Sequence, residues 1–281
     1  MDYEAYRVDS RRRWEGAASG WDERREAVRS AAAPVAQWIV DAADPQPGET
    51  IVEVACGLGD TGLLAARRVG PAGRVILTDG APAMVEAAGR AIAATGADHV
   101  EARAMEAEWL DLETASADAI LSRWGYMLLA DPEAALREAR RVLRPGGRIA
   151  LAVWAPQSEN PWIGVLQEQL LARGLATIPE PGTPGMFALA DQTALTELLW
   201  AAGFSDVRLE RVPFAWEAPD VDAWWEHMRV TSISLGETLQ GLAPAEHYAL
   251  RDAVDAAYAQ YARPNGSLQL PACALGAFAL A

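Results

Sequence analysis

A glycine-rich turn and two carboxylates are the residues whose types and spacing point most directly to chemistry. The turn at 57–62 has glycine at its first, third and last positions and follows an apolar run that carries Glu53. Asp79 ends the next apolar run, 20 residues beyond Gly59. Glycines between a strand and a helix let the backbone approach a ligand that a side chain would block. A carboxylate at that distance can accept ribose hydroxyls, so the pattern predicts a nucleotide or nucleoside site.

Two classes of ligand fit this turn. Its glycine spacing and Asp79 match the dinucleotide fingerprint, so an NAD(P)-dependent oxidoreductase is one interpretation. Glu53, however, lies within the strand, where a carboxylate suits the amino group of a methionine moiety and would sit poorly beneath a pyrophosphate. The chain also contains no lysine, which excludes the tyrosine-x-x-x-lysine site of short-chain dehydrogenases. These features favour S-adenosylmethionine, bound either by an enzyme or by a non-catalytic binding protein.

Apolar runs and amphipathic stretches alternate along the first half of the chain. Strands are expected at 50–55, 74–78, 100–104, 119–122 and 148–154, with helices at 61–69, 83–94 and 132–143. Strands that alternate with helices across short turns form a parallel sheet covered on both faces. Right-handed crossovers then give a doubly wound, Rossmann-like α/β fold.

Five segments resemble, in order and spacing, the motifs of the class I S-adenosylmethionine-dependent methyltransferases. They are EVACGLG at 53–59, VILTDGAPAMV at 75–85, AMEA at 104–107, AILSRWGYMLL at 119–129 and RVLRPGGRIAL at 141–151. The first resembles the family's acidic-x-Gly-x-Gly-x-Gly motif, with Ala55 in the place of the first glycine. The chain is most similar to the branch of ubiquinone/menaquinone-type C-methyltransferases and natural-product methyltransferases, over roughly residues 10–155.

This resemblance implies a seven-stranded, mostly parallel sheet whose last strand, at 268–280, is antiparallel, with helical cap insertions. It also implies S-adenosylmethionine as the cofactor. Asp79 would then hold the ribose, Glu106 the adenine amino group, and Ser122 with Arg123 the methionine end. The full set of expected cofactor-binding residues is Trp21, Glu53, Ala55, Gly57, Gly59, Asp79, Gly80, Met84, Glu106, Ala107, Ser122 and Arg123.

The same reasoning divides the chain into a cofactor-binding core and added helical parts. The expected segments are N-terminal lid helices at 1–47, a cofactor-binding core at 48–155, an insertion at 156–190, a core helix and sixth strand at 191–213, a helical cap at 214–264, and the last strand at 265–281.

Methyl transfer from a sulfonium is a direct displacement, so the protein mainly aligns the acceptor and excludes water. An oxygen or carbon acceptor still gains from a base. The candidates are His227 and His247 in the cap and Tyr126 after the fourth strand, although a surface histidine or a packed tyrosine fits each position as well. Tryptophans concentrated in the lid and insertions favour a small, largely apolar or aromatic acceptor, or else anchor the cap.

Composition narrows the partners further. The net charge is −15, which disfavours nucleic acid and anionic membrane surfaces. Cys56 and Cys273 are too isolated for a disulfide framework, and the histidines lack metal-ligand spacing, so no metal is expected. The charged N-terminus has no apolar signal region and no apolar run is long enough to span a membrane, so a cytoplasmic protein is expected. The oligomeric state stays open.

Overall fold

One mixed β-sheet runs through the computed structural model, which describes residues 2–180 and 182–281, and of residue 234 the backbone alone. The strands are β1 (Thr50–Val54), β2 (Arg74–Asp79), β3 (Val100–Ala104), β4 (Ala117–Arg123), β5 (Leu143–Trp154), β6 (Ser205–Ala218) and β7 (Leu268–Leu280). Their order is β3-β2-β1-β4-β5-β7-β6, and β7 alone among them runs antiparallel to its neighbours. The predicted seven-stranded sheet with an antiparallel last strand is confirmed.

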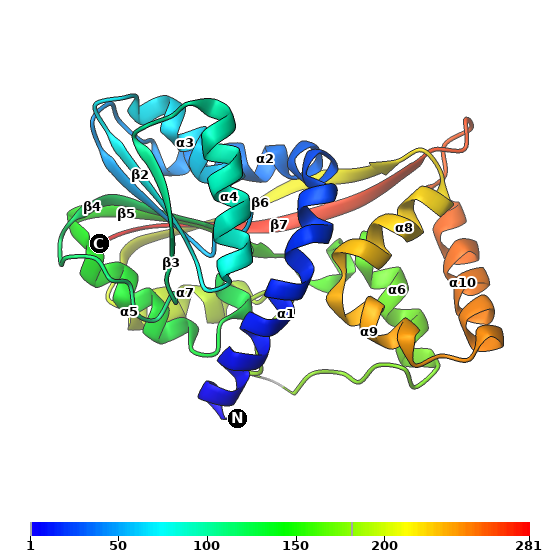
Figure 1. Ribbon diagram of the computed structural model, residues 1–281. Coiled ribbons are helices and arrows are strands. Elements are labelled where there is room, and N and C mark those ends of the chain that lie inside the picture. The colour runs from blue at the N-terminus through cyan, green and yellow to red at the C-terminus, as the bar shows by residue number, and fades with distance from the viewer. Residues whose placement is uncertain (1, 181) are drawn as a thin grey trace.

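Helices cover both faces of this sheet, as a doubly wound fold requires. They are α1 (Tyr3–Glu23), α2 (Arg25–Ala43), α3 (Asp60–Val69), α4 (Pro82–Thr95), α5 (Pro132–Val142), α6 (Pro161–Ala172), α7 (Gln192–Ala201), α8 (Val221–Thr231), α9 (Ile233–Gln240) and α10 (Pro244–Tyr258), with short 3₁₀ turns η1 (Tyr126–Leu128), η2 (Gln157–Glu159) and η3 (Ala259–Tyr261). Figure 1 shows α2 and α3 on one side of the sheet and α5 and α7 on the other. The central strands are apolar and buried because both of their faces are covered.

The sixth strand is longer than the sequence suggested. Residues 214–218 continue β6 and pair with β7 as far as Ala218 opposite Leu268, so the expectation that the cap begins at 214 is wrong. Apolar side chains at Phe214, Trp216 and Ala218 keep the period of two that a strand requires. Pro213 does not end the strand, because β6 lies at the sheet edge, where a missing N–H is tolerated.

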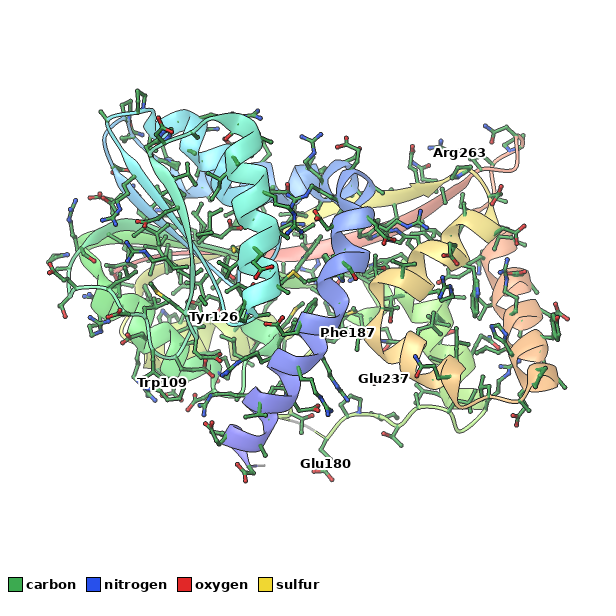
Figure 2. All side chains as sticks on the ribbon, in the orientation of Figure 1. Trp109, Tyr126, Glu180, Phe187, Glu237 and Arg263 are labelled. Atoms are coloured by element: carbon green, nitrogen blue, oxygen red, sulfur yellow. The ribbon has the colours of Figure 1, made fainter. Side chains whose placement is uncertain are left out.

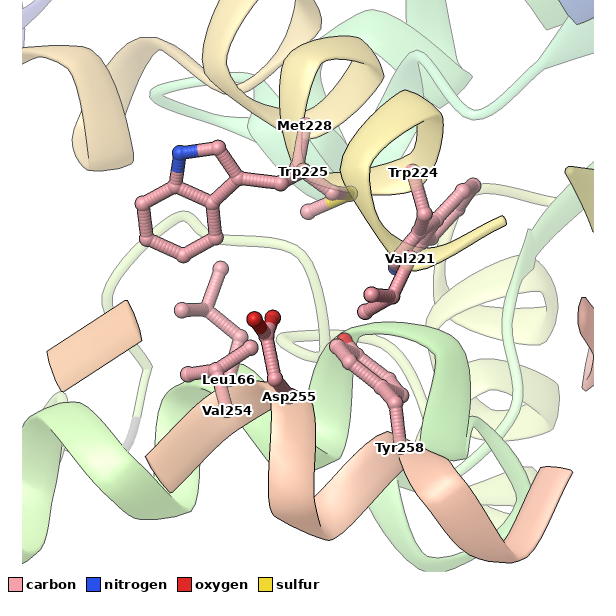
Figure 3. A pocket seen from close by; sticks show the side chains of 8 residues that line it. All are labelled: Leu166, Val221, Trp224, Trp225, Met228, Val254, Asp255 and Tyr258. Atoms are coloured by element: carbon pink, nitrogen blue, oxygen red, sulfur yellow. The ribbon is translucent and has the colours of Figure 1, made fainter. Parts of the chain in front are cut away.

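The elongated strands carry a helical cap at the far end of the molecule (Figure 1). The cap consists of α8, α9 and α10 together with α6, and α8 turns a stripe of apolar side chains toward α6 and α10. Figure 3 shows Trp224, Trp225 and Met228 on the side of α8 that faces Leu166 of α6 and Val254 and Tyr258 of α10. The first helix, α1, passes in front of the sheet edge and packs against both α4 and α8.

Asn160 joins the cap to the sheet. Its side chain is fully buried, and its Nδ2 donates to the carbonyl oxygens of Ala155 and Cys273, each at 3.0 Å. Its Oδ1 accepts the Cys273 N–H at 2.9 Å and the Trp162 indole N–H at 3.1 Å. One amide therefore fixes the end of β5, the middle of β7 and the first turn of α6. Nothing in the local sequence indicated this role, because its partner Cys273 lies 113 positions away.

We predict that Asn160→Ala lowers the free energy of unfolding by about 3 kcal/mol or more, because several buried backbone and indole groups lose their partner. Urea unfolding followed by tryptophan fluorescence measures this change. Asn265→Ala is the matched control: Asn265 is exposed and bonds only within its own turn, so a loss below about 1 kcal/mol is expected. Equal losses in the two variants would contradict the role given to Asn160.

Candidate functional site

The glycine turn lies between β1 and α3, at the edge where the parallel strands end. Gly57 has a φ of +53° and no atom lies within 4 Å of the place where its Cβ would be, so this part of the backbone is open to a ligand. Gly59, at φ +81°, is the N-cap of α3. A Cβ there would lie 2.6 Å from Leu77 Cδ1, so the helix approaches the sheet closely only because the residue is glycine.

Ala55 stands in a left-handed conformation, with φ +52°, at the place where the family motif has its first glycine. Such a conformation costs a residue with a Cβ roughly 1–2 kcal/mol. The methyl group finds room because residue 125 is glycine: a Cβ at Gly125 would lie 2.5 Å from that of Ala55. The two positions therefore compensate for one another across the β1–β4 boundary. Sequence reasoning missed this pairing, since it depends on the register of two strands.

Asp79 occupies the end of β2 and bridges two loops. Its Oδ2 accepts the Gly57 N–H and its Oδ1 accepts the Ala81 N–H, both at 2.9 Å. Burial raises the pKa of Asp79 to about 6; the two N–H donors oppose that rise, and the nearby Glu106 charge adds to it. Each carboxylate oxygen keeps a lone pair for a further donor. The carboxylate is thus held in place beside the open turn, where a ribose hydroxyl can reach it.

Glu106 lies beside Asp79, after the end of β3. A Cβ on Gly80 would meet Glu106 Oε2 at 2.9 Å, so the glycine makes room for this carboxylate. In this structure Glu106 forms an ion pair with Arg11 of α1. The next residue, Ala107, is buried. The expected adenine-binding residues therefore meet in one place, and the lid helix lies directly over them.

A small apolar cluster closes the site from the side of α1. Trp21 and Met84 pack against Leu58 of the glycine turn, and the Trp21 indole N–H donates to the Thr231 carbonyl of α8 at 3.1 Å. Trp21 and Met84 were both expected at the cofactor, and the structure brings them together beside its turn. The lid thus contacts the core and the cap at once.

Charged and polar groups gather at the ends of β1 and β4. Glu53 is buried and its Oε2 accepts the Gly62 N–H at 2.8 Å. Burial raises the pKa of Glu53 to about 8, while the Arg123 charge and the Gly62 N–H oppose that rise. Arg123 Nε donates to Thr61 Oγ1 at 3.2 Å. Arg123 Nη1 and Ser122 Oγ are buried and have no hydrogen-bond partner within the described part of the chain.

This donor set fits the methionine end of S-adenosylmethionine. Arg123 Nη1 and the Ser122 hydroxyl, which lack partners among the described residues, suit a carboxylate, and Glu53 suits the ammonium group beside it. Asp79, with the open turn at Gly57, suits the ribose. The residues predicted for the cofactor therefore lie along one edge of the sheet, from Glu106 at one end to Arg123 at the other.

The three candidate bases are separated in the structure. His227 is buried, stacks on Trp224 with ring centroids 5.1 Å apart, and lies 5.2 Å from Trp216. Burial, with a smaller effect of the Arg24 charge, lowers the pKa of His227 to about 4. His247, on α10, instead lies beside Trp225, with ring centroids 5.9 Å apart. The two histidines therefore contact different rings and form no pair.

Tyr126 belongs to the core of the sheet domain. Figure 2 shows it on the opposite side of α1 from the cap helices. Its ring is 1% exposed, and burial with the charge of Glu108 raises its pKa well above the usual range for tyrosine. A phenol held neutral inside the core is poorly suited to act as a base. Of the three predicted candidates, only His227 lies among the aromatic side chains described next.

Six aromatic side chains form a continuous row from the end of β4 into the cap. This aromatic row consists of Trp124, Trp154, Phe214, Trp162, Trp216 and Trp224. Trp124 stacks on Trp154 with centroids 4.2 Å apart, and Trp154 lies 4.9 Å from Trp162. The row begins beside the methionine end of the cofactor site and ends at His227. The sequence indicated an aromatic cap but not Trp154, the last residue of β5, which joins the cap rings to the sheet.

The described residues contain neither a metal-binding cluster nor a membrane-spanning helix. No group of histidine, cysteine, aspartate and glutamate side chains there could hold a metal ion. None of the helices described combines the length and the apolar character needed to cross a bilayer.

Comparison with known proteins shows which family the chain belongs to. Residues 51–147 match the model of a methyltransferase domain. Nocamycin O-methyltransferase of Saccharothrix syringae is 30% identical over 211 residues, which cover 70% of this chain and 75% of that protein. This chain is a class I S-adenosylmethionine-dependent methyltransferase. Its cofactor is therefore S-adenosylmethionine, and the oxidoreductase interpretation and that of a non-catalytic binder are set aside.

Two further comparisons show a partial sequence match to another methyltransferase and a fold shared with a solved structure. The ubiquinone/menaquinone biosynthesis C-methyltransferase UbiE of Caulobacter sp. strain K31 is 39% identical over 113 residues, covering 37% of this chain and 44% of that protein. Among solved structures, YcgJ from Bacillus subtilis shares the fold, with a TM-score of 0.57 at 17% identity, over 87% of this chain and 97% of that one.

We predict that Asp79→Ala weakens binding of S-adenosylhomocysteine by about 2 kcal/mol, roughly 30-fold, through loss of charge-assisted hydrogen bonds. Calorimetric titration measures the affinity. Glu86→Ala, which removes an exposed carboxylate from α4, serves as the control and should bind normally. An unchanged affinity in Asp79→Ala would remove this residue from the cofactor site.

Proposed function

We propose that this methyltransferase transfers the methyl group to a small, largely apolar or aromatic acceptor, at oxygen or carbon. The aromatic row carries this proposal, because it runs from the methionine end of the cofactor site to a buried histidine. Stacked and tilted rings bind planar apolar groups through dispersion and ring–ring contacts. A small-molecule acceptor also agrees with the net charge of −15, which disfavours nucleic acid.

When bound, S-adenosylmethionine supplies the methyl group on a sulfonium, so the displacement needs alignment more than acid–base chemistry. Asp79 and the open turn at Gly57 would hold the ribose, and Arg123 with Ser122 the methionine carboxylate. The acceptor would lie against Trp124 and its neighbours in the aromatic row. Each of these groups is fixed by the backbone or by stacking before any ligand arrives, which limits the entropy lost on binding.

The lid and cap keep water away from the reacting groups. Arg25 donates to the carbonyl oxygens of Leu58 and Ala87, at 3.0 and 3.1 Å, and so anchors α2 on the turn and on α4. At the other end of the lid, the Tyr6 hydroxyl donates to the Leu128 carbonyl at 3.1 Å. These contacts hold α1 across the edge of the sheet. A closed edge of this kind strengthens every electrostatic contact inside it.

His227 is the residue that would receive a proton from the acceptor. With its pKa near 4, the imidazole is neutral at neutral pH, so one ring nitrogen can accept a hydrogen bond from a phenol or enol. Its low basicity makes it a weak base, and its contribution should lie near the low end of general-base catalysis. Because His227 lies at the cap end of the aromatic row, the proton it would take belongs to a hydroxyl that is remote from the methylated atom and conjugated with it, on an acceptor that extends along the row.

An acceptor panel tests the proposal. We expect formation of S-adenosylhomocysteine with 2-naphthol and 1,3-dihydroxynaphthalene, and none above background with ethanolamine or an RNA oligonucleotide. Mass spectrometry of the product, with a deuterated methyl donor, identifies the methylated atom. Transfer confined to the amine or the RNA would contradict the proposed acceptor class.

We predict that His227→Gln lowers kcat on the hydroxylated acceptors by about tenfold or more, while the affinity for S-adenosylhomocysteine stays the same. The matched control is His247→Gln, a histidine in the same cap that contacts Trp225 instead of the aromatic row. A loss of equal size in both variants would indicate damage to the cap and not a base.

The pH dependence sharpens this test. Because the pKa of His227 is lowered to about 4, its base form persists as the pH falls, whereas an ordinary histidine would be protonated below about pH 6.5. Asp79 and Glu53 have pKa values of about 6 and 8 and act equally in both enzymes. The ratio of wild-type to His227→Gln rates should therefore stay constant from about pH 8 to 5.5. A ratio that falls near pH 6.5 would contradict the lowered pKa.

A further inference from the structure

Three consecutive residues at the end of β4 carry polar atoms that the fold buries without a partner. They are Ser122 Oγ, Arg123 Nη1 and Trp124 Nε1, each lacking a hydrogen bond within the described residues. The sheet order reverses between β1 and β4, and ligands of open α/β sheets bind at such a switch point. Leaving a buried polar group unpaired destabilises the fold, so three in a row point to a ligand that completes them.

Trp124 is also strained. Its φ of +62° lies in the left-handed region, which is rare and strained for a bulky residue. Its own N–H donates to the Ala152 carbonyl at 2.7 Å, and its ring stacks on Trp154 at an angle of 13°. The Arg123 guanidinium carbon lies over the same ring, 4.9 Å from its centroid. The surroundings thus fix both the backbone and the ring of Trp124, although its indole N–H has no partner.

We propose that Trp124 determines acceptor specificity by donating its indole N–H to an oxygen atom of the acceptor. This rests on the proposed function and narrows it. An indole N–H can only donate, so its partner must accept a hydrogen bond. A carbonyl, phenol or phenolate oxygen meets that condition and a protonated amine does not. The acceptor class is therefore a planar ring system that bears an oxygen at the edge facing β4, beside the stacked pair of Trp124 and Trp154.

The donors on the two residues before Trp124 are assigned to the cofactor and not to the acceptor. Arg123 and Ser122 fit the carboxylate of the cofactor, as described above, which leaves the Trp124 N–H for the acceptor. Trp162, in the middle of the aromatic row, already donates to Asn160 Oδ1 at 3.1 Å. Trp216 and Trp224 also have buried N–H groups without a described partner, but both lie in the cap half of the row. Trp124 is thus the row member that combines a free donor with a place at the switch point.

The test uses two ligands that differ in one atom's chemistry, 2-acetylnaphthalene and 2-isopropenylnaphthalene. Both are planar, neither donates a hydrogen bond, and only the first carries a carbonyl oxygen. Affinities are measured on the full chain saturated with S-adenosylhomocysteine. We expect the wild-type protein to prefer the ketone by about tenfold, the value of one neutral hydrogen bond. Trp124→Phe keeps a ring against Trp154, removes the donor, and should reduce the preference to about one.

Two variants serve as controls, each losing one indole of the row. Trp162→Phe should change both affinities alike and keep the preference, because its N–H is already used by Asn160. Trp216→Phe should also keep the preference. The proposal is overturned if wild type shows no preference, if Trp124→Phe retains it, or if Trp216→Phe abolishes it. Normal binding of S-adenosylhomocysteine by each variant shows that the cofactor site is intact.

A second measurement needs no variant, in case Trp124→Phe does not fold. In wild-type protein with ¹⁵N-labelled indoles, the ketone should move one indole N–H resonance downfield, and the alkene should not. Absence of that shift overturns the proposal. Both measurements report recognition without methyl transfer. Failure of the proposed function would instead appear as no turnover of any planar acceptor by a protein that binds the cofactor product.

Discussion

The carboxylate of Asp79 ties the ends of two parallel strands together, and the rest of the site depends on this contact. By accepting N–H groups from both Gly57 and Ala81, it sets the distance between the glycine turn and the start of α4. The parallel strands end at one edge of the sheet, so this contact sets the position of the loops that line that edge. Its raised pKa shows the cost of keeping a carboxylate buried where a ligand must reach it.

Several destabilising features of this kind lie close together in the site. Glu53 is a buried ionisable group, and Asp79 and Arg123 are half-buried ones. Ala55 and Trp124 have left-handed backbones, and the Ser122 hydroxyl has no partner among the described residues. Buried charges and unpaired donors destabilise a fold unless a ligand completes them. The core around them compensates, because the central strands bury apolar side chains on both faces. Strain and unsatisfied groups therefore concentrate where a zwitterionic cofactor and its acceptor would meet.

Much of this arrangement could be predicted from the sequence, because local patterns determine it. The alternation of strands and helices indicated the sheet, and the glycine turn with Asp79 predicted a cofactor-binding edge, whose residues the structure brings together. What could not be predicted depends on contacts between distant segments. The Ala55–Gly125 pair, the Asn160 contacts and the length of β6 follow from strand register. The sequence offered His227, His247 and Tyr126 as bases, and only packing decides which of them meets the aromatic row.

In the proposed function, the extension of β6 and β7 keeps acceptor recognition apart from cofactor recognition. Both strands complete the sheet beside β5 and then continue to the cap, so Phe214 and Trp216 lie on the same strand as core residues such as Val212. Rings on the extension can change without altering Asp79, Gly57 or Arg123, which belong to other strands and loops. Trp124 is the exception, since it follows β4 directly and stacks on the last residue of β5. A change of acceptor that spared this tryptophan would therefore involve the cap, whereas a change at Trp124 would also affect Arg123 and the cofactor edge.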